Sequence, residues 1–277
     1  MVTCTGPPLR YSSLICYPLF WSRQRHVHSL DYGPSEDNEH AVFPIRDHNP
    51  SGTFPYITVS LITINSLVFL YEVSLGQRLE TFLFHYGMVP YLVTNFSRIP
   101  EIGFADVAAT FVTSMFLHGG WLHIIGNMWY LWIFGDNIED RLGHLRFFFF
   151  YLACGLAAGL IQYITSPNAR VPTVGASGAI AGVLGAYFLC FPRARIDLLL
   201  FFFFFVDIVP VPAFLVLFFW FVMQFFNGVL SLGAGVMAGG VAWWAHIAGF
   251  VGGLLLIRIV PKAQRSRQAH YHPRFDR

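Results

Sequence analysis

Charged residues are scarce in this chain of 277 residues: Asp, Glu, Lys and Arg make up 12% of it, whereas hydrophobic residues make up 55%. A soluble domain of ordinary composition carries about a quarter charged residues, so the composition argues against a water-soluble globular protein. The net charge of +2 offers no strongly basic surface, and we expect no nucleic-acid partner. The sequence predicts instead a protein that crosses a lipid bilayer several times.

Motifs of several common chemistries are also missing. The cysteines are Cys4, Cys16, Cys154 and Cys190. They form no C-x-x-C pair, and we interpret them as small hydrophobic residues rather than disulfides or ligands. The chain has no H-E-x-x-H motif, and no carboxylate lies within four positions of His123 or in the apolar segment of His246, which disfavours zinc proteolysis. No pair of aspartates within the spans supports an aspartyl protease. We expect neither a metal nor another cofactor.

The chain does contain six apolar segments that we interpret as membrane spans. They are residues 56–75, 120–138, 145–164, 174–191, 213–229 and 240–260. Residues 76–105 hold only short amphipathic pieces, which we expect to lie on the membrane surface. The Phe-rich residues 198–206 are too short to span and are separated from the next segment by prolines, so we expect them at the interface as well. The predicted fold is an all-α polytopic membrane protein, a bundle of six transmembrane helices.

The positions of the six segments divide the chain into three predicted parts. These are a poorly ordered cytoplasmic extension (1–54), the six-span domain (55–261) and a basic cytoplasmic tail (262–277). Lys and Arg number 14 on the side of the two termini and three on the other, which predicts that both termini are cytoplasmic. We expect a bacterial-type inner (plasma) membrane. The first 30 residues contain no acidic residue, a composition also typical of mitochondrial presequences, so that location remains an alternative.

The fourth span carries a serine in a glycine-rich context, Gly175-Ala176-Ser177-Gly178. A lone serine in a span usually packs against another helix. Here, however, Gly175 and Gly178 flank it at the start of a span, where backbone N–H groups lack helical partners and are able to stabilise an oxyanion. Ser177 is therefore a candidate nucleophile.

The sixth span carries His246 beside small residues at four-residue spacing, Ala245, Gly249 and Gly253, and the fourth span has Gly178, Gly182 and Ala186 at the same spacing. Small residues at this spacing let two helices approach closely. Packing of the two stripes would bring His246 to Ser177, and a neutral imidazole is the base that a serine nucleophile needs. Without a nearby carboxylate we expect a Ser–His dyad, although a packing histidine is the simpler alternative.

The second span places His123 and Asn127 on one helix face, four residues apart. They form either an interhelical hydrogen-bonding pair or a set of donors for an oxyanion site. His118 lies in the preceding Leu117-His118-Gly119-Gly120 turn, and we expect it to shape the loop.

In this order the residues resemble the rhomboid intramembrane serine proteases. The matching pieces are His118-x-x-x-x-His123-x-x-x-Asn127, Gly135-x-x-x-Glu139-x-Arg141-Leu142-Gly143, Gly175-Ala176-Ser177-Gly178 and Ala245-His246-x-x-Gly249. The resemblance covers about residues 42–260. Some members stack an aromatic residue on the catalytic histidine one turn after the serine, where this chain has Ala181.

The resemblance implies hydrolysis of a peptide bond near the outer end of a substrate's transmembrane segment, with small residues favoured at the cut. It implies that Ser177 is the nucleophile, that His246 is the general base, and that His123, Asn127 and the Ser177 amide form the oxyanion hole. Glu139 and Arg141 would form a structural ion pair. The expected partners are membrane-protein substrates within the lipid bilayer. An inactive relative that binds membrane segments and a small transporter remain alternatives.

Overall fold

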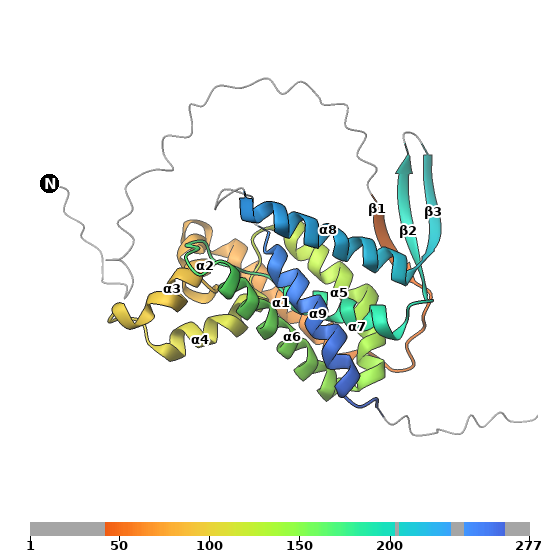
Figure 1. Cartoon of the computed structure of the whole chain (residues 1–277), viewed down its shortest axis with the longest axis horizontal. Helices are drawn as coiled ribbons and strands as arrows, with labels where there is room; N and C mark the ends of the chain where they lie inside the picture. The colour runs from red at the N-terminus through yellow and green to blue at the C-terminus, as the bar shows by residue number, and fades with distance from the viewer. Residues whose placement is uncertain (1–41, 203–204, 234–240, 264–277) are drawn as a thin grey trace, which may run out of the picture.

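The computed structural model describes residues 42–202, 205–233 and 241–263, and it is a bundle of helices with a small β-sheet at one end (Figure 1). The six segments predicted to span the membrane are all helical. They correspond to α1 (Tyr56–Ser74), α5 (Trp121–Leu142), α6 (His144–Thr165), α7 (Ser177–Cys190), α8 (Ala213–Gly233) and α9 (Trp243–Ile259).

The length and apolarity of these helices differ. In the described part of the chain, α1, α6 and α8 are each long and apolar enough to cross a membrane. A fourth candidate is the pair formed by Phe104–Phe116 and α5, which bend by 79° at the break between them. The apolar helices α7 and α9 are shorter. The molecule is therefore mostly helical with three or four candidate spans by these criteria.

The connection between α1 and α5 contains short helices rather than a further long one. They are η2 (Gly76–Arg78), α2 (Leu79–Tyr86), α3 (Pro90–Asn95), η3 (Phe96–Arg98), α4 (Phe104–Thr113) and η4 (Ser114–Phe116). The backbone groups of Met88 and Thr173 exchange hydrogen bonds of 3.2 and 2.8 Å, which hold this connection beside the residues that precede α7.

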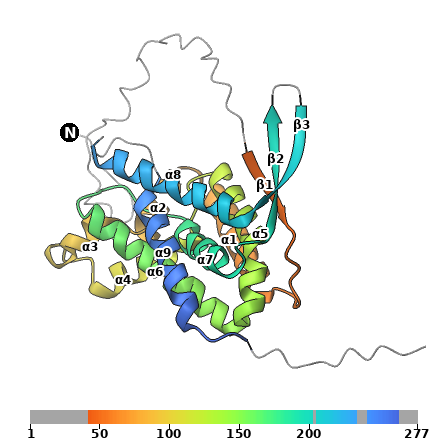
Figure 2. The same ribbon diagram turned by 45° about the vertical axis from the view of Figure 1, so that its right-hand side comes forward.

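The prediction of an all-α fold is wrong in one region, because the chain contains a three-stranded antiparallel sheet in the order β1-β2-β3. Its strands are β1 (Val42–Asp47), β2 (Arg195–Phe202) and β3 (Phe205–Pro212), and it lies at the end of the bundle where α8 begins (Figures 1 and 2). The Phe-rich segment expected at the membrane interface is thus a hairpin. Its Phe, Val and Ile residues favour strands, and an edge strand such as β3 tolerates proline.

The sheet also changes the description of the N-terminal part. Residues 1–41 of the expected poorly ordered extension lie outside the described residues, but β1 is ordered by pairing with β2, from Val42 opposite Leu200 to Asp47 opposite Ile196. Asp197 of β2 accepts a 2.8 Å hydrogen bond from Arg46 and lies 2.6 Å from His48. These hydrogen bonds lower the pKa of the Asp197 carboxyl. Most of the expected tail (262–277) also lies outside the described residues.

Polar contacts join β1 to the far end of α7. The Tyr187 hydroxyl donates a 2.7 Å hydrogen bond to Asp47, and the amide of Asn137 donates another at 2.9 Å. Burial raises the pKa of the Asp47 carboxyl to about 6, although the hydrogen bond from Tyr187 opposes the shift. The strand is thereby fixed to the core of the bundle.

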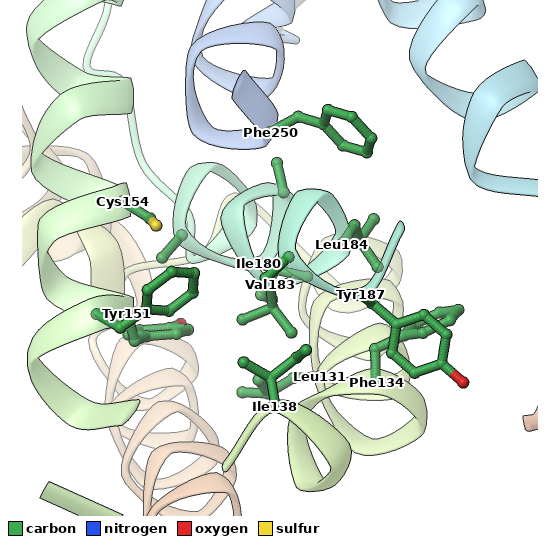
Figure 3. Close-up of a cluster of buried hydrophobic side chains, with 14 of the residues drawn as sticks. Leu131, Phe134, Ile138, Tyr151, Cys154, Ile180, Val183, Leu184, Tyr187 and Phe250 are labelled. Carbon is green, nitrogen blue, oxygen red and sulfur yellow. The ribbon is translucent and has the colours of Figure 1, made fainter. Parts of the chain in front are cut away.

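Helix α7 lies at the centre of the bundle and contacts α5, α6, α8 and α9. All residues from Gly178 to Tyr187 are buried, as expected for a helix that is apolar on every side. Figure 3 shows its side chains among those of α5, α6 and α9. The enclosure of α7 fixes the place of its first residue, Ser177, which is partly buried.

Candidate active site

The side chains of Ser177 and His246 lie within hydrogen-bonding distance. Oγ of Ser177 is 2.8 Å from Nε2 of His246, a good geometry for donation by the hydroxyl. Ser177 is the first residue of α7 and His246 lies in the first turn of α9. The two residues predicted from separate apolar segments, 69 positions apart, are therefore brought together.

Direct backbone contact between α7 and α9 produces this geometry. A Cβ atom on Gly249 would lie 2.0 Å from the carbonyl oxygen of Gly178, and one on Gly253 would lie 1.9 Å from that of Gly182. Such distances are far below van der Waals contact, so only glycine fits. The close approach that the small-residue spacing predicted is confirmed.

His123 of α5 lies beside Gly175 and Ser177, and Asn127 follows it one turn later on the same helix. Nδ1 of His123 accepts a 3.3 Å hydrogen bond from the Gly119 N–H, which leaves the proton of the neutral ring on Nε2. That Nε2 borders the space beside the Gly175 Cα, and Oγ of Ser177 borders the same space. Asn127 is 8% exposed and its side-chain NH₂ has no partner among the described residues. One side-chain donor, Nε2–H of His123, thus lies near the serine, and the Asn127 amide is a second buried donor without a partner among the described residues.

Gly175 has a φ of +127°, a conformation that side chains with a Cβ rarely adopt. Its N–H donates a 2.9 Å hydrogen bond to the Ser114 carbonyl, and a Cβ at this position would lie 2.8 Å from the His123 ring. Gly178, by contrast, is helical and lies against Ala158 of α6. The two glycines therefore serve the backbone conformation and the helix packing respectively.

His118 is buried in the turn before α5, and its ring nitrogens have no hydrogen-bonding partner among the described residues. Its backbone N–H lies 3.3 Å from the Glu72 carboxylate of α1, and its ring lies 5.2 Å from that of His123 between centroids. Glu72 is itself 1% exposed. The sequence interpretation overlooked Glu72, whose signal is a carboxylate near the end of an apolar segment.

A small cavity of about 30 Å³ lies beside Ser177. It is lined by residues of the connection that precedes α5, of α6, of α7 and of the start of α9. Most of its lining is small or apolar, namely Met88, Phe111, Ser114, Met115, Gly155, Ala158, Gly159, Thr173, Val174, Gly175, Ser177, Gly178, Ala179, Ala242 and Ala245. A space of this size accommodates a group of the size of one or two water molecules.

Helix α8 contributes two contacts to His246 that the sequence interpretation missed. Oε1 of Gln224 lies 2.7 Å from Nδ1 of His246, and the Trp220 ring lies 6.0 Å from the imidazole at an interplanar angle of 34°. Ala181 carries no ring, and Trp220 supplies an aromatic neighbour from another helix. The sequence does indicate Gln224 as a functional candidate, because it is a single glutamine in a Phe-rich apolar segment.

Glu139 does not form the expected ion pair with Arg141 among the described residues. It is fully buried and accepts hydrogen bonds from the N–H groups of Ile57 and Thr58 and from the Thr58 hydroxyl, at 2.7–2.8 Å. Its other contact is Nδ1 of His144, at 2.6 Å. Glu139 thus caps the first turn of α1, where helical N–H groups lack backbone acceptors.

Comparison with known proteins decides the family. The model of the rhomboid domain matches residues 106–263, more than half of the chain. The chain belongs to the rhomboid family. Its similarity extends to Rhomboid protein 1, mitochondrial, of Saccharomyces cerevisiae, which is 32% identical over 167 residues, or 57% of this chain and 43% of that protein. Rhomboid protease GluP of Bacillus subtilis is 40% identical over 75 residues, or 27% of this chain and 14% of GluP.

The resemblance seen in the sequence is therefore confirmed at the level of the family. A further relative, the putative rhomboid protease YdcA of Bacillus subtilis, is 37% identical over 76 residues, which cover 27% of this chain and 38% of YdcA. The rhomboid chain spans less than half the length of each of these relatives.

The prediction of a bacterial-type plasma membrane is wrong. Relatives from Saccharomyces cerevisiae, Danio rerio, Mus musculus and Arabidopsis thaliana carry the word mitochondrial in their names. The yeast relative matches more than half of this chain, whereas the bacterial proteases match about a quarter. The cytoplasmic location of the two termini, which was predicted from the distribution of Lys and Arg, is part of the same localisation and is withdrawn with it.

Proposed function

We propose that this rhomboid protein is an intramembrane serine endopeptidase in which Ser177 is the nucleophile and His246 is the general base. The observation that carries the proposal is the 2.8 Å contact between Ser177 Oγ and His246 Nε2. A serine hydroxyl is a weak nucleophile until a neighbouring base accepts its proton. Such a pair inside an apolar bundle is unusual, because polar groups there are costly and mark function.

In the first step Ser177 Oγ attacks the carbonyl carbon of the scissile peptide bond while its proton passes to Nε2 of His246. The imidazolium then gives this proton to the leaving amine, and an acyl-enzyme remains. In the second step a water molecule gives a proton to His246, attacks the ester and releases the carboxylate product. The proton returns to Ser177 Oγ, so His246 ends each cycle neutral.

The negative charge on the substrate oxygen needs donors that are already in place. Three are available: Nε2–H of His123, the side-chain NH₂ of Asn127 and the N–H of Ser177 at the start of α7. The Asn127 amide lacks another partner among the described residues, which suits a group whose acceptor is the substrate. Each such donor contributes about 10²–10³-fold to the rate.

The cavity beside Ser177 supports a preference for small side chains at the cleaved bond. Its volume of about 30 Å³ and its glycine and alanine lining leave room for a methyl or hydroxymethyl group. The side chain of a leucine or phenylalanine is too large for a cavity of this volume. The proposed substrates are therefore transmembrane segments of other proteins with Ala, Ser or Gly at the cut.

We further propose that α1 and α5–α9 form six spans, with α7 and α9 crossing despite their shortness because their buried glycine contact lies within the bundle. The names of the mitochondrial relatives and the acid-free first 30 residues support a mitochondrial membrane. The membrane-spanning domain would cover residues 55–261. The partners are then membrane proteins of that organelle.

The test uses the purified protein in detergent with two probes, a fluorophosphonate that labels reactive serines and a fluorescent transmembrane peptide with alanine near one end. We expect labelling at Ser177, located by mass spectrometry, and cleavage of the peptide. Ser177→Ala should abolish labelling, and Ser177→Ala and His246→Ala should each slow cleavage by about 10⁴-fold or more. The matched control is Ser60→Ala, because Ser60 is exposed and its hydroxyl donates to the Tyr56 carbonyl of its own helix.

Cleavage that persists in Ser177→Ala would contradict this mechanism. An inactive relative that binds membrane segments predicts neither labelling nor cleavage by the wild-type protein. Ser60→Ala should behave as the wild type in both assays.

A further inference from the structure

His246 has a second hydrogen-bonding partner in addition to Ser177. Its Nε2 lies 2.8 Å from Ser177 Oγ and its Nδ1 lies 2.7 Å from Oε1 of Gln224. Gln224 is 6% exposed, whereas the neighbouring residues Met223 and Phe225 are 59% and 45% exposed. The amide therefore projects from the inner side of α8, and both imidazole nitrogens are bonded, one to α7 and one to α8.

We propose that Gln224 is a positioning residue for the reaction, which holds His246 in the tautomer that accepts the serine proton. A neutral imidazole carries its single proton on either Nδ1 or Nε2. Ser177 is activated only when Nε2 is free, so Nδ1 must carry the proton and needs an acceptor. The Gln224 carbonyl supplies that acceptor and completes a Ser–His–Gln relay. This inference rests on the proposed protease function.

An amide suits this position better than the carboxylate of soluble serine proteases. The relay lies inside an apolar bundle, where an ionised carboxylate costs a few kcal/mol. A carbonyl dipole fixes the imidazole orientation and stabilises the imidazolium that forms during the reaction, and it does so without a charge to bury. No Asp or Glu occurs in α7, α8 or α9, so an amide is what these helices provide.

Trp220 supports the same role from one turn before Gln224 on α8. Its ring lies 6.0 Å from the His246 ring at 34°, and the Trp243 ring lies 6.3 Å away at 87°. One aromatic ring is thus tilted and the other nearly perpendicular to the imidazole, and the two neighbours restrict rotation about the His246 side-chain bonds. The orientation of His246 is then set mainly by α8, whereas Ser177 is set by α7.

The experiment measures the labelling of Ser177 by a fluorophosphonate, resolved into the affinity for the probe and the maximal rate of inactivation. Gln224→Met keeps the length of the side chain and removes the acceptor; we expect the maximal rate to fall about 10- to 100-fold with unchanged affinity. Gln224→Glu keeps an acceptor oxygen and should restore at least a third of the wild-type rate. A matched control is Gln162→Met, because Gln162 lies on α6 and its side-chain carbonyl has no partner among the described residues.

Several outcomes overturn the inference. A maximal rate for Gln224→Met within twofold of the wild type shows that the contact is not needed. Equal losses in Gln224→Met and Gln224→Glu, in samples with wild-type unfolding temperatures, show that acceptance at Nδ1 is not the reason. If Gln224→Met does not fold, Gln224→Leu takes its place under the same criteria. Absence of labelling in the wild type overturns the proposed protease function itself. That result is distinct from a loss of support for the role of Gln224 alone, in which the wild type is still labelled.

Discussion

The contact between α7 and α9 makes a quantitative prediction for Gly249→Ala. The added Cβ would lie 2.0 Å from the Gly178 carbonyl oxygen, whereas a carbon–oxygen contact requires about 3.3 Å. The helices must therefore separate by about 1.3 Å at this point. Gly249 lies one turn from His246 and Gly178 follows Ser177, so the displacement falls on the dyad. The 2.8 Å contact widens to about 4 Å, beyond hydrogen-bonding distance.

A misplacement of about 1 Å costs about 100-fold in rate, and we expect fluorophosphonate labelling and peptide cleavage to slow by that factor in Gly249→Ala. The protein should still fold, because the overpacking cost of about 1–3 kcal/mol is offset by the better helix propensity of alanine, about 1 kcal/mol. The unfolding temperature in micelles checks this point.

Gly252→Ala is the matched control, since it makes the same change on the same helix. A Cβ on Gly252 would meet only the Ala157 Cβ, at 3.8 Å, which is an ordinary contact. This variant should label at the wild-type rate and be slightly more stable. The reasoning is refuted if Gly249→Ala labels within threefold of Gly252→Ala, because the close approach would then not determine the geometry of the dyad.

Two further predictions concern stability. Asp47 binds its proton more tightly when folded, because burial raises its pKa to about 6; its contribution to stability is therefore greatest at low pH and is lost as pH rises from about 4 to 6. Asp47 is only half-buried, and solvent screens part of the unfavourable free energy of its charge at pH 7.5. Asp47→Asn should therefore be about 1 kcal/mol more stable than the wild type at that pH. Unfolding curves should show this gap closing below pH 4, and a gap independent of pH would contradict the assignment. Glu139→Ala should lower the free energy of unfolding by about 3 kcal/mol, because it leaves the first N–H groups of α1 and the Thr58 hydroxyl without their acceptor; the exposed Glu80→Ala, which should change it by less than about 0.5 kcal/mol, is the control.

The helices and the pairing of α7 with α9 were predictable because their determinants are local. Apolar segments of about 20 residues predict helices wherever the backbone must satisfy its own hydrogen bonds. Glycines at four-residue spacing indicate where two helices approach, and Gly249 and Gly253 do contact Gly178 and Gly182. Packing of the small residues of α7 against those of α9 predicted that Ser177 and His246 lie close together.

The sheet was not predictable in the same way. The run 198–206 is apolar enough for an interfacial helix, and its strand form depends on β1, about 150 positions earlier in the sequence. Pairing over such a separation leaves no local pattern. Pro210 and Pro212 were interpreted as separating this run from the next span, whereas both lie on the edge strand β3, a position that is compatible with proline.

Contacts between side chains of different helices also could not be predicted from the sequence. Gln224 was visible as an isolated amide in an apolar segment, but its partner is identified only by the packing of α8 on α9. Glu139 and Arg141 are near each other in the motif, yet the Glu139 carboxylate accepts hydrogen bonds from the first N–H groups of α1. In both cases the polar residue could be recognised from the sequence while its partner could not.

The enclosure of α7 contrasts with the position of α8, which lies along the outside of the bundle and continues directly from β3 (Figure 1). Ser177 stands on the best-anchored helix and the acceptor for His246 on one of the least buried. A disturbance that shifts α8 would therefore separate Gln224 from His246 while leaving Ser177 in place. Under the proposed serine mechanism, this shifted state keeps the serine in position but lacks a correctly oriented base, so it is inactive.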